Sequence, residues 1–145
     1  KITTYRELAE HGLKRIERFF PQMGAPWTET APMPGGDIAN ADFEAFRQKL
    51  KEDYPWMPIS LRHHYGRLYG TRVARIVGEA TSVEDLGTHF GGDLFQAEVK
   101  YLVAEEWAQT AEDVLWRRTK HRLHLTEAEQ AAFAEWFADA YARAA

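Results

Sequence analysis

Apolar side chains recur with helical spacing along most of this chain, and this pattern constrains the fold more than any other feature. The last such segment begins at Thr126, with Glu129 three residues later in the form of a capping box. The apolar residues that follow share one face of a helix: Phe133, Trp136, Phe137, Ala140 and Tyr141. The sequence therefore predicts an all-α fold, a compact domain of about six helices.

The other helices are expected from the same spacing and from residues that begin or end a helix. In the first, Thr4 and Glu7 have capping-box form, and Pro21 ends the apolar run. Asn40 or Asp42 is expected to cap the second. The remaining helices are expected over about 42–54, 58–69, 94–107, 110–122 and 126–141.

Residues 70–92 are where helix and strand are hardest to separate. The β-branched run from Val73 to Val77 fits helical spacing but also suits a strand. Ser82 and Asp85 favour a single capped turn before a stretch marked by glycines. We expect no β-hairpin in the chain.

Residues 21–40 contain too many Pro and Gly residues for a helix or a central strand. They are Pro21, Gly24, Pro26, Pro32, Pro34, Gly35 and Gly36. Trp27, Met33 and Ile38 lie in the same stretch as apolar anchors that a flexible linker does not need. We therefore expect a long ordered loop after the first helix.

Composition limits the classes of function. A net charge of −4 argues against a nucleic-acid-binding surface over the whole domain, because phosphate recognition needs concentrated Lys and Arg. The absence of Cys excludes disulfides, thiol nucleophiles and thiolate metal sites, and it fits a reducing compartment. No apolar run reaches the roughly 18 residues of a membrane span. We expect a cytoplasmic protein that does not bind nucleic acid.

The histidines do not follow a metal-binding pattern in the sequence. His63 and His64 are adjacent, and neighbouring residues on a helix point about 100° apart and cannot both face one ion. His121 lies three residues before His124, but no His-Glu-x-x-His motif occurs, and no Glu has a His three residues later. The sequence therefore predicts structural or surface histidines and no metal site.

A dense basic run from Arg117 to Arg122 follows Trp116. Such a run could bind nucleic acid or anionic lipid. We favour a helix C-terminus instead, because Glu112 and Asp113 lie in the first turn of the same predicted helix and complete the charge order that suits the helix dipole.

The start of the first helix, beside Lys1, leaves free N–H groups and partial positive charge that suit an anion or a polarised carbonyl. Spacing alone favours an ordinary chain end without that role. No glycine-rich phosphate loop and no Ser-His-Asp arrangement is recognisable. The chain therefore has no complete catalytic site of its own.

Two strings near the ends of the chain carry a family resemblance: Lys1-Ile2-Thr3-Thr4-Tyr5-Arg6 and Thr110-Ala111-Glu112-Asp113-Val114-Leu115-Trp116-Arg117-Arg118-Thr119-Lys120. Both resemble the aerobic, FAD-dependent glycerol-3-phosphate dehydrogenase family. Shorter similar strings follow in the same order between them: Pro34-Gly35-Gly36-Asp37, Tyr69-Gly70-Thr71-Arg72, Leu86-Gly87 with Phe90-Gly91, and Glu98 to Trp107. The likeness covers nearly the whole chain.

The resemblance implies that residues 1–145 form a helical C-terminal cap domain whose flavin and substrate domain lies upstream, outside this chain. Enzymes of that family oxidise sn-glycerol 3-phosphate to dihydroxyacetone phosphate, reduce FAD and pass electrons to membrane quinone. FAD would be bound by the upstream domain, and this chain alone would hold no cofactor and be inactive. The full enzyme would lie peripherally on the cytoplasmic face of the inner membrane. Whether it forms a homo-oligomer is left undecided.

The resemblance also implies roles for single residues. Lys1 is a candidate contact to the substrate phosphate or the flavin side, and Ile2 and Thr3 would lie against the cofactor. Arg117, Arg118 and Thr119 belong to a string that can mark packing within the domain as readily as chemistry. Our hypothesis is that their helix braces the first helix and the flavin domain through charge-assisted contacts.

Two other classes of function stay open. One is a helical interaction module that docks on a protein partner or membrane surface through exposed aromatic residues and the basic run. The other is a free-standing helical metalloenzyme, against which the missing Glu-x-x-His pairs count. The identity of the quinone, and the choice between dehydrogenase and oxidase, are not readable from the chain.

Overall fold

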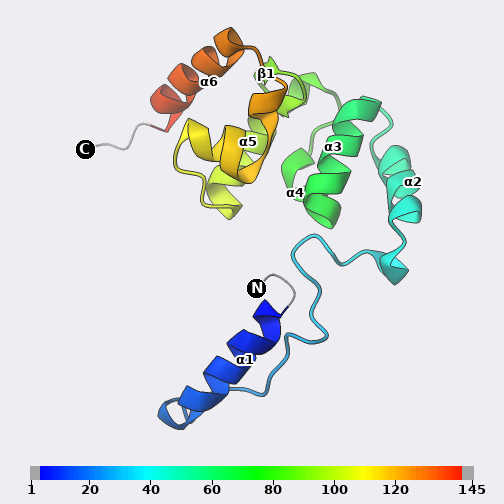
Figure 1. The fold of residues 1–145 in the computed structure, drawn as a ribbon. Helices are drawn as coiled ribbons and strands as arrows, with labels where there is room; N and C mark the ends of the chain where they lie inside the picture. The colour runs from blue at the N-terminus through cyan, green and yellow to red at the C-terminus, as the bar shows by residue number, and fades with distance from the viewer. Residues whose placement is uncertain (1–3, 142–145) are drawn as a thin grey trace.

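Helices make up most of the computed structural model, which describes residues 4–141. The α-helices are α1 Tyr5–Ile16, α2 Phe43–Asp53, α3 Ile59–Tyr69, α4 Val73–Val77, α5 Gln96–Glu105 and α6 Glu127–Ala140 (Figure 1). A π-helix, η5 Asp113–Arg118, and a 3-10 turn, η6 His121–Leu123, connect α5 to α6. The predicted all-α fold is confirmed, and within residues 4–141 no helix is long and apolar enough to cross a membrane.

Short 3-10 turns fill several of the connections between the helices. They are η1 Glu17–Phe19, η2 Ala39–Ala41, η3 Gly70–Arg72 and η4 Glu84–Leu86. The segment whose state was open, Val73–Val77, is helical. The capped turn predicted at Ser82 and Asp85 is also confirmed. Asp85 accepts hydrogen bonds from the backbone N–H groups of Thr81 and Ser82, each at 2.9 Å.

A small antiparallel hairpin, β1 His89–Gly91 and β2 Leu94–Phe95, contradicts the prediction that the chain has none. Its turn depends on Gly91 and Gly92, whose φ angles of 116° and 53° lie where glycine is favoured. The helix expected from residue 94 therefore starts only at Gln96. Trp107 lies beyond its end and is exposed.

Helix caps explain most of the element boundaries. Asp42 caps α2 by accepting a hydrogen bond from the backbone N–H of Ala45 at 2.9 Å, as expected. Thr126 and Glu129 form the predicted capping box of α6. The capping box predicted at Thr4 is wrong, because its side chain makes no cap hydrogen bond in the structure.

The core lies among α2 to α6 and the hairpin. Its largest fully buried apolar side chains come from α3, the hairpin region, α5 and α6: Leu61, Tyr65, Leu86, Leu94, Leu102 and Phe133. Phe133 of α6 meets Phe90 of β1 edge to face, with ring centroids 5.0 Å apart. Each helix of this body contributes an apolar face to one shared interior.

α1 does not contribute to that core. Figure 1 shows α1 apart from the other helices, joined to them by the loop that leads to α2. No residue of α1 is buried, and its apolar side chains are exposed together with those of the next turn: Tyr5, Leu8, Leu13, Ile16, Phe19, Phe20 and Met23. The contacts of α1 are with the loop, through Tyr5 and Met33 and through Arg6 and Thr28.

The loop over 21–40 is attached to the body at its end, where Ile38, one of the three expected anchors, is half-buried. Trp27 and Met33 are exposed, so the prediction that they anchor the loop is wrong. Instead the backbone N–H of Thr71 donates to the carbonyl of Gly35 at 3.1 Å. A Cβ atom on Gly35 would lie 2.1 Å from the carbonyl oxygen of Tyr69, so this approach requires glycine.

Candidate functional site

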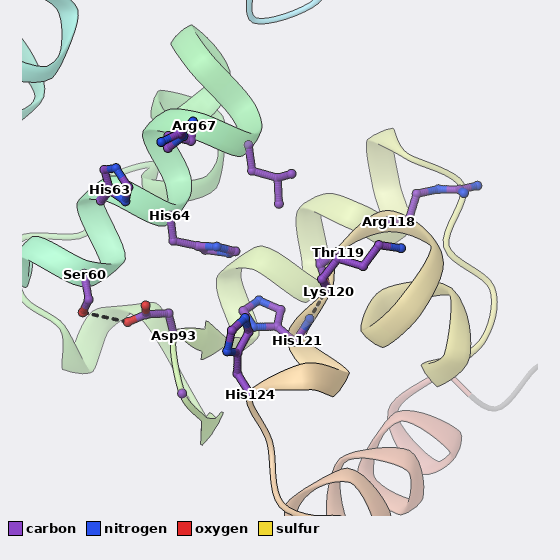
Figure 2. Close-up of a pocket in the computed structure, with 12 residues that line it drawn as sticks. Ser60, His63, His64, Arg67, Asp93, Arg118, Thr119, Lys120, His121 and His124 are labelled. Carbon is purple, nitrogen blue, oxygen red and sulfur yellow. Dashed lines mark hydrogen bonds between the residues drawn. The ribbon is translucent and has the colours of Figure 1, made fainter. Parts of the chain in front are cut away.

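A cavity of about 720 Å³ lies between α3 and the segment from η5 to α6. Figure 2 shows its labelled lining residues. Its basic side chains come from both sides: His63, His64 and Arg67 from α3, and Arg118, Lys120, His121 and His124 from the later segment. Asp93, in the turn of the hairpin, is the carboxylate of the lining and accepts a hydrogen bond from the Ser60 hydroxyl at 3.0 Å.

A buried carboxylate, Glu98 of α5, lies behind His64 and His121, two of the four histidines that line this cavity. His64 Nε2 lies 2.9 Å and the Tyr69 hydroxyl 2.5 Å from Glu98 Oε1. His121 Nε2 lies 3.1 Å from Glu98 Oε2. We call Glu98, His64, His121 and Tyr69 the Glu98 cluster. All polar contacts of this carboxylate come from side chains of α3 and η6.

The cluster keeps Glu98 ionised. Burial alone would raise the pKa of its carboxyl, but the hydrogen bonds and charges of His121 and His64 outweigh burial and leave the pKa below its usual value. Burial would lower the pKa of His64, and the bond to Glu98 and its negative charge raise it instead. Burial and the nearby carboxylate raise the pKa of the Tyr69 hydroxyl far above its ordinary range, so it stays a donor.

The fold brings these residues together although they are far apart in the sequence. Figure 2 shows His64 reaching from α3 toward His121, while the adjacent His63 points away from it. The argument that neighbouring histidines cannot face one point therefore holds for His63 and His64. It does not apply to His64 and His121, whose ring centroids lie 4.7 Å apart.

One signal in the sequence marks Glu98 as unusual. It lies three residues after Phe95 and four before Leu102, so a helix places it on the apolar face with both. A charged residue on a buried face needs partners, because an unpaired buried charge is costly. The partners, 34 and 23 residues away, are not readable from spacing.

The predicted brace residues lie at the end of η5. Arg117 is exposed and pairs with Asp113, Nη1 to Oδ1 at 2.7 Å. Arg118 donates from Nε to the carbonyl of Glu106 at 2.6 Å, and Thr119 is buried and donates from its hydroxyl to the carbonyl of Val114 at 2.5 Å. These bonds of Arg118 and Thr119 are internal to the domain, and a contact with another domain stays a prediction.

The start of η5 is fixed by Asp113. Its carboxylate accepts hydrogen bonds from the backbone N–H groups of Gln109 and Thr110, each at 3.0 Å. The hydrogen bond from Arg117 and these two hold the pKa of Asp113 well below its usual range. Arg117 and Arg118 thus end a helix that an acidic residue begins, although this helix is of the π type. The single helix expected over 110–122 is wrong, because the chain turns extended at Thr119 and Arg122 lies in the separate turn η6.

Lys1, Ile2 and Thr3 lie outside the described residues. Their expected contacts with substrate phosphate and flavin stay predictions.

A family model described as the C-terminal domain of alpha-glycerophosphate oxidase matches residues 26–142. The chain belongs to this family. The resemblance drawn from the two terminal strings is thereby confirmed. The match includes the cavity, the Glu98 cluster and η5, and it starts after α1.

Relatives of this alpha-glycerophosphate oxidase C-terminal family are much longer than the chain. It is 64% identical over 140 residues to a D-erythritol 1-phosphate dehydrogenase of Brucella abortus, which covers 97% of this chain and 28% of the relative. It is 40% identical over 139 residues to the aerobic glycerol-3-phosphate dehydrogenase of Escherichia coli, covering 96% of this chain and 28% of that protein. A glycerol-3-phosphate dehydrogenase of Pseudomonas aeruginosa is 43% identical over 136 residues, covering 94% of the chain and 26% of the relative. The chain spans about a quarter of the length of these relatives.

Proposed function

We propose that this chain is the C-terminal domain of a FAD-dependent dehydrogenase that oxidises a polyol phosphate. The observation that carries the proposal is the 64% identity to a D-erythritol 1-phosphate dehydrogenase over 97% of the chain. In that role the domain has no complete site of its own and supports a flavin and substrate domain of the same polypeptide. Lys1, Ile2 and Thr3 would then approach the flavin from the start of α1.

The exposed apolar face of α1 supports this arrangement. An amphipathic helix normally buries its apolar stripe against another surface, and large exposed apolar patches mark interfaces. The family match begins at residue 26, after α1, and the part of these relatives outside the match is about two and a half times as long as the matched part. We assign the flavin domain as the surface that covers the face formed by Leu8, Leu13, Ile16, Phe19 and Phe20.

The residues between 4 and 141 do not fit a flavin site. They contain no glycine-rich phosphate loop of the dinucleotide-binding kind, and the cavity beside α3 opens onto basic side chains rather than an apolar slot for a flavin ring. FAD would supply the hydride acceptor from the upstream domain. That this chain alone binds no cofactor stays a prediction.

Between the two substrates, D-erythritol 1-phosphate is proposed ahead of sn-glycerol 3-phosphate, because identity to the erythritol enzyme is higher than to the Escherichia coli glycerol enzyme. Purified full-length enzyme, assayed with an artificial electron acceptor, should show a kcat/KM at least about tenfold higher for D-erythritol 1-phosphate. The reverse preference would return the assignment to glycerol 3-phosphate. Turnover of neither substrate would contradict the proposed function.

The position of α1 can be tested in the same full-length enzyme. Leu13→Gln should lower the flavin content of the purified protein and its melting temperature, because a polar amide would enter an apolar interface. Lys14→Gln, at the exposed neighbouring position, is the matched control and should change neither. Equal flavin content and melting temperature for both variants would rule out docking through this face.

Electron transfer to membrane quinone and a peripheral place on the cytoplasmic face of the inner membrane belong to the same proposal. Exposed aromatic and basic side chains would equally suit docking on a membrane surface, which is the alternative function. Sedimentation of the full-length enzyme with anionic and neutral vesicles separates the two. If Leu13→Gln abolishes vesicle binding and leaves flavin content unchanged, α1 faces the membrane and not the flavin domain.

A further inference from the structure

We propose that His64, Glu98 and His121 bind a divalent transition-metal ion, zinc by preference, with one coordination position facing the cavity beside α3. The site goes beyond the proposed dehydrogenase function, and its test is metal content rather than activity.

The ligand atoms already converge. One ligand atom from each of the three residues lies within 4.8 Å of the others. Zinc binds imidazole nitrogen at roughly 2.0–2.1 Å and carboxylate oxygen at roughly 2.0–2.2 Å, so tetrahedral ligands lie about 3.3 Å apart. The separations from His64 Nε2 to Glu98 Oε1, 2.9 Å, and from His121 Nε2 to Glu98 Oε2, 3.1 Å, are close to this value. Each histidine faces a different oxygen, so an ion held by one oxygen requires the carboxylate or one imidazole to turn.

The donor set selects the metal. Two imidazoles and one carboxylate form a common zinc site with an open fourth position, whereas calcium and magnesium prefer oxygen ligands alone. Both histidines present Nε2 to the same carboxylate, which is the orientation that ligation requires. The Tyr69 hydroxyl, 2.5 Å from Glu98 Oε1, is an outer partner of the kind that fixes a ligating carboxylate in place.

The fold also provides enclosure and access. Glu98 and His121 are buried, while His64 is 23% exposed on the side of the cavity. The three ligands come from α3, α5 and η6, so the site exists only in the folded domain. A bound ion would link three elements that the chain connects through long intervening segments, and it would stabilise the folded state.

Nearby cations do not fill the space that the ion needs. Lys120 Nζ donates to the carbonyl of Trp116 at 2.5 Å and lies over its ring, and Arg118 is held by the carbonyl of Glu106. Both side chains still line the cavity. Their charge favours an anion as the fourth ligand of the ion over a neutral molecule.

Hydrogen bonds alone also satisfy Glu98, so the test must separate a metal from protons at the same nitrogens. The full-length enzyme is stripped with a chelator, equilibrated with zinc chloride, passed through a desalting column and analysed for zinc per chain. His121→Gln and His64→Gln each keep a hydrogen-bond donor for Glu98 but remove a ligand. His63→Gln and His124→Gln change histidines that line the same cavity outside the cluster, and they are the matched controls.

Wild type and the two controls should each retain about one zinc atom per chain at this site. His121→Gln and His64→Gln should lose it. Tyr69→Phe keeps all three ligands and should weaken zinc binding by about 10- to 100-fold in titration calorimetry. If His121→Gln alters the circular dichroism spectrum, His64→Gln, at the partly exposed position, decides. Equal zinc content in wild type and the His64 variant, or an equal loss of zinc in the controls, would overturn the assignment.

Discussion

α1 and the helical body differ in which side chains they bury. α1 and the turn after it expose large apolar residues, including Leu8, Phe19 and Phe20. The body from α2 to α6 buries most of its apolar residues and also encloses an ionised carboxylate, Glu98, with hydrogen-bond partners of its own. The apolar core of the body is therefore covered by its own fold, whereas the apolar face of α1 needs another surface to cover it.

The comparison also separates two kinds of evidence for function. An exposed apolar patch indicates contact with another surface but does not identify it. The proposed occupant, the flavin domain, rests on the greater length of the relatives and on the start of the family match after α1. A buried polar cluster is defined by atoms of the chain itself. Its chemistry can be argued from distances alone.

The largest difference between the regions should appear when one aromatic residue is removed from each. Phe133→Ala takes a fully buried ring from the core and should lower the free energy of unfolding by about 3–5 kcal/mol. Phe20→Ala, in the exposed turn after α1, should change the stability of the 145-residue chain by less than about 0.5 kcal/mol. Urea denaturation followed by circular dichroism measures both, and a comparable loss for Phe20→Ala would show that α1 is part of the core.

The junction between the loop and the body should be sensitive at one glycine and tolerant at another. Gly35→Ala places a side chain at a φ of 80° and against the Tyr69 carbonyl, and it should cost more than about 1–2 kcal/mol. Gly24→Ala meets nothing within 4 Å and should be neutral or stabilising by up to about 1 kcal/mol. Thermal melts check this. An equal change in melting temperature for the two variants would contradict this account of the junction.

The cap at Asp113 should make part of the stability of the body depend on pH. The folded-state pKa of Asp113 is lowered, chiefly by its bond to Arg117, so its contribution is complete above the unfolded value of about 3.9. That contribution is lost as pH falls from about 3.9 toward the folded pKa. Asp113→Asn keeps an oxygen that accepts from the backbone N–H groups but removes the charge paired with Arg117, so it should cost up to about 1 kcal/mol at pH 7 and reduce the loss of stability on acidification.

Parallel melting curves from pH 7 to pH 3 for wild type and Asp113→Asn check this prediction. If the melting temperatures of the two proteins differ by the same amount at every pH, the Asp113 carboxylate does not contribute to the pH dependence of stability.

The smallest effect is expected from Arg117→Ala in the 145-residue chain. Its ion pair with Asp113 is exposed, and such pairs contribute about 0–1 kcal/mol. In the full-length enzyme the same variant should lower flavin content more than substrate affinity, because the proposed brace acts between domains. Lys49→Ala removes a similar exposed pair in α2 and is the control. A raised KM with unchanged flavin content and melting temperature would exclude the brace.

Local sequence rules predicted the elements whose ends are fixed by their own residues. Asp42 and the Thr126–Glu129 pair begin α2 and α6 as expected, because a cap is made by residues three apart. The hairpin at residues 89–95 was missed because two adjacent glycines can equally form a loop. Trp27 and Met33 were misjudged as anchors because apolar character alone does not show where the covering surface is.

The Glu98 cluster shows where prediction from one sequence stops. The position of Glu98 on an apolar helix face is a local signal that the carboxylate is buried. His64 and His121 become its partners only through the tertiary packing of α3 and η6 on α5. By contrast, the family resemblance was readable from the strings at residues 1–6 and 110–120, since it needed no knowledge of contacts.

Amide hydrogen exchange of α1 in two contexts tests most directly the claim that this helix is covered by the flavin domain. We expect the amides of α1 to exchange quickly in the 145-residue chain, while those of α3 and α5 are protected by the core. In the full-length enzyme the amides of α1 should become at least about 100-fold more protected, and those of α3 and α5 should change little. Equally fast exchange of α1 in both proteins would contradict the account.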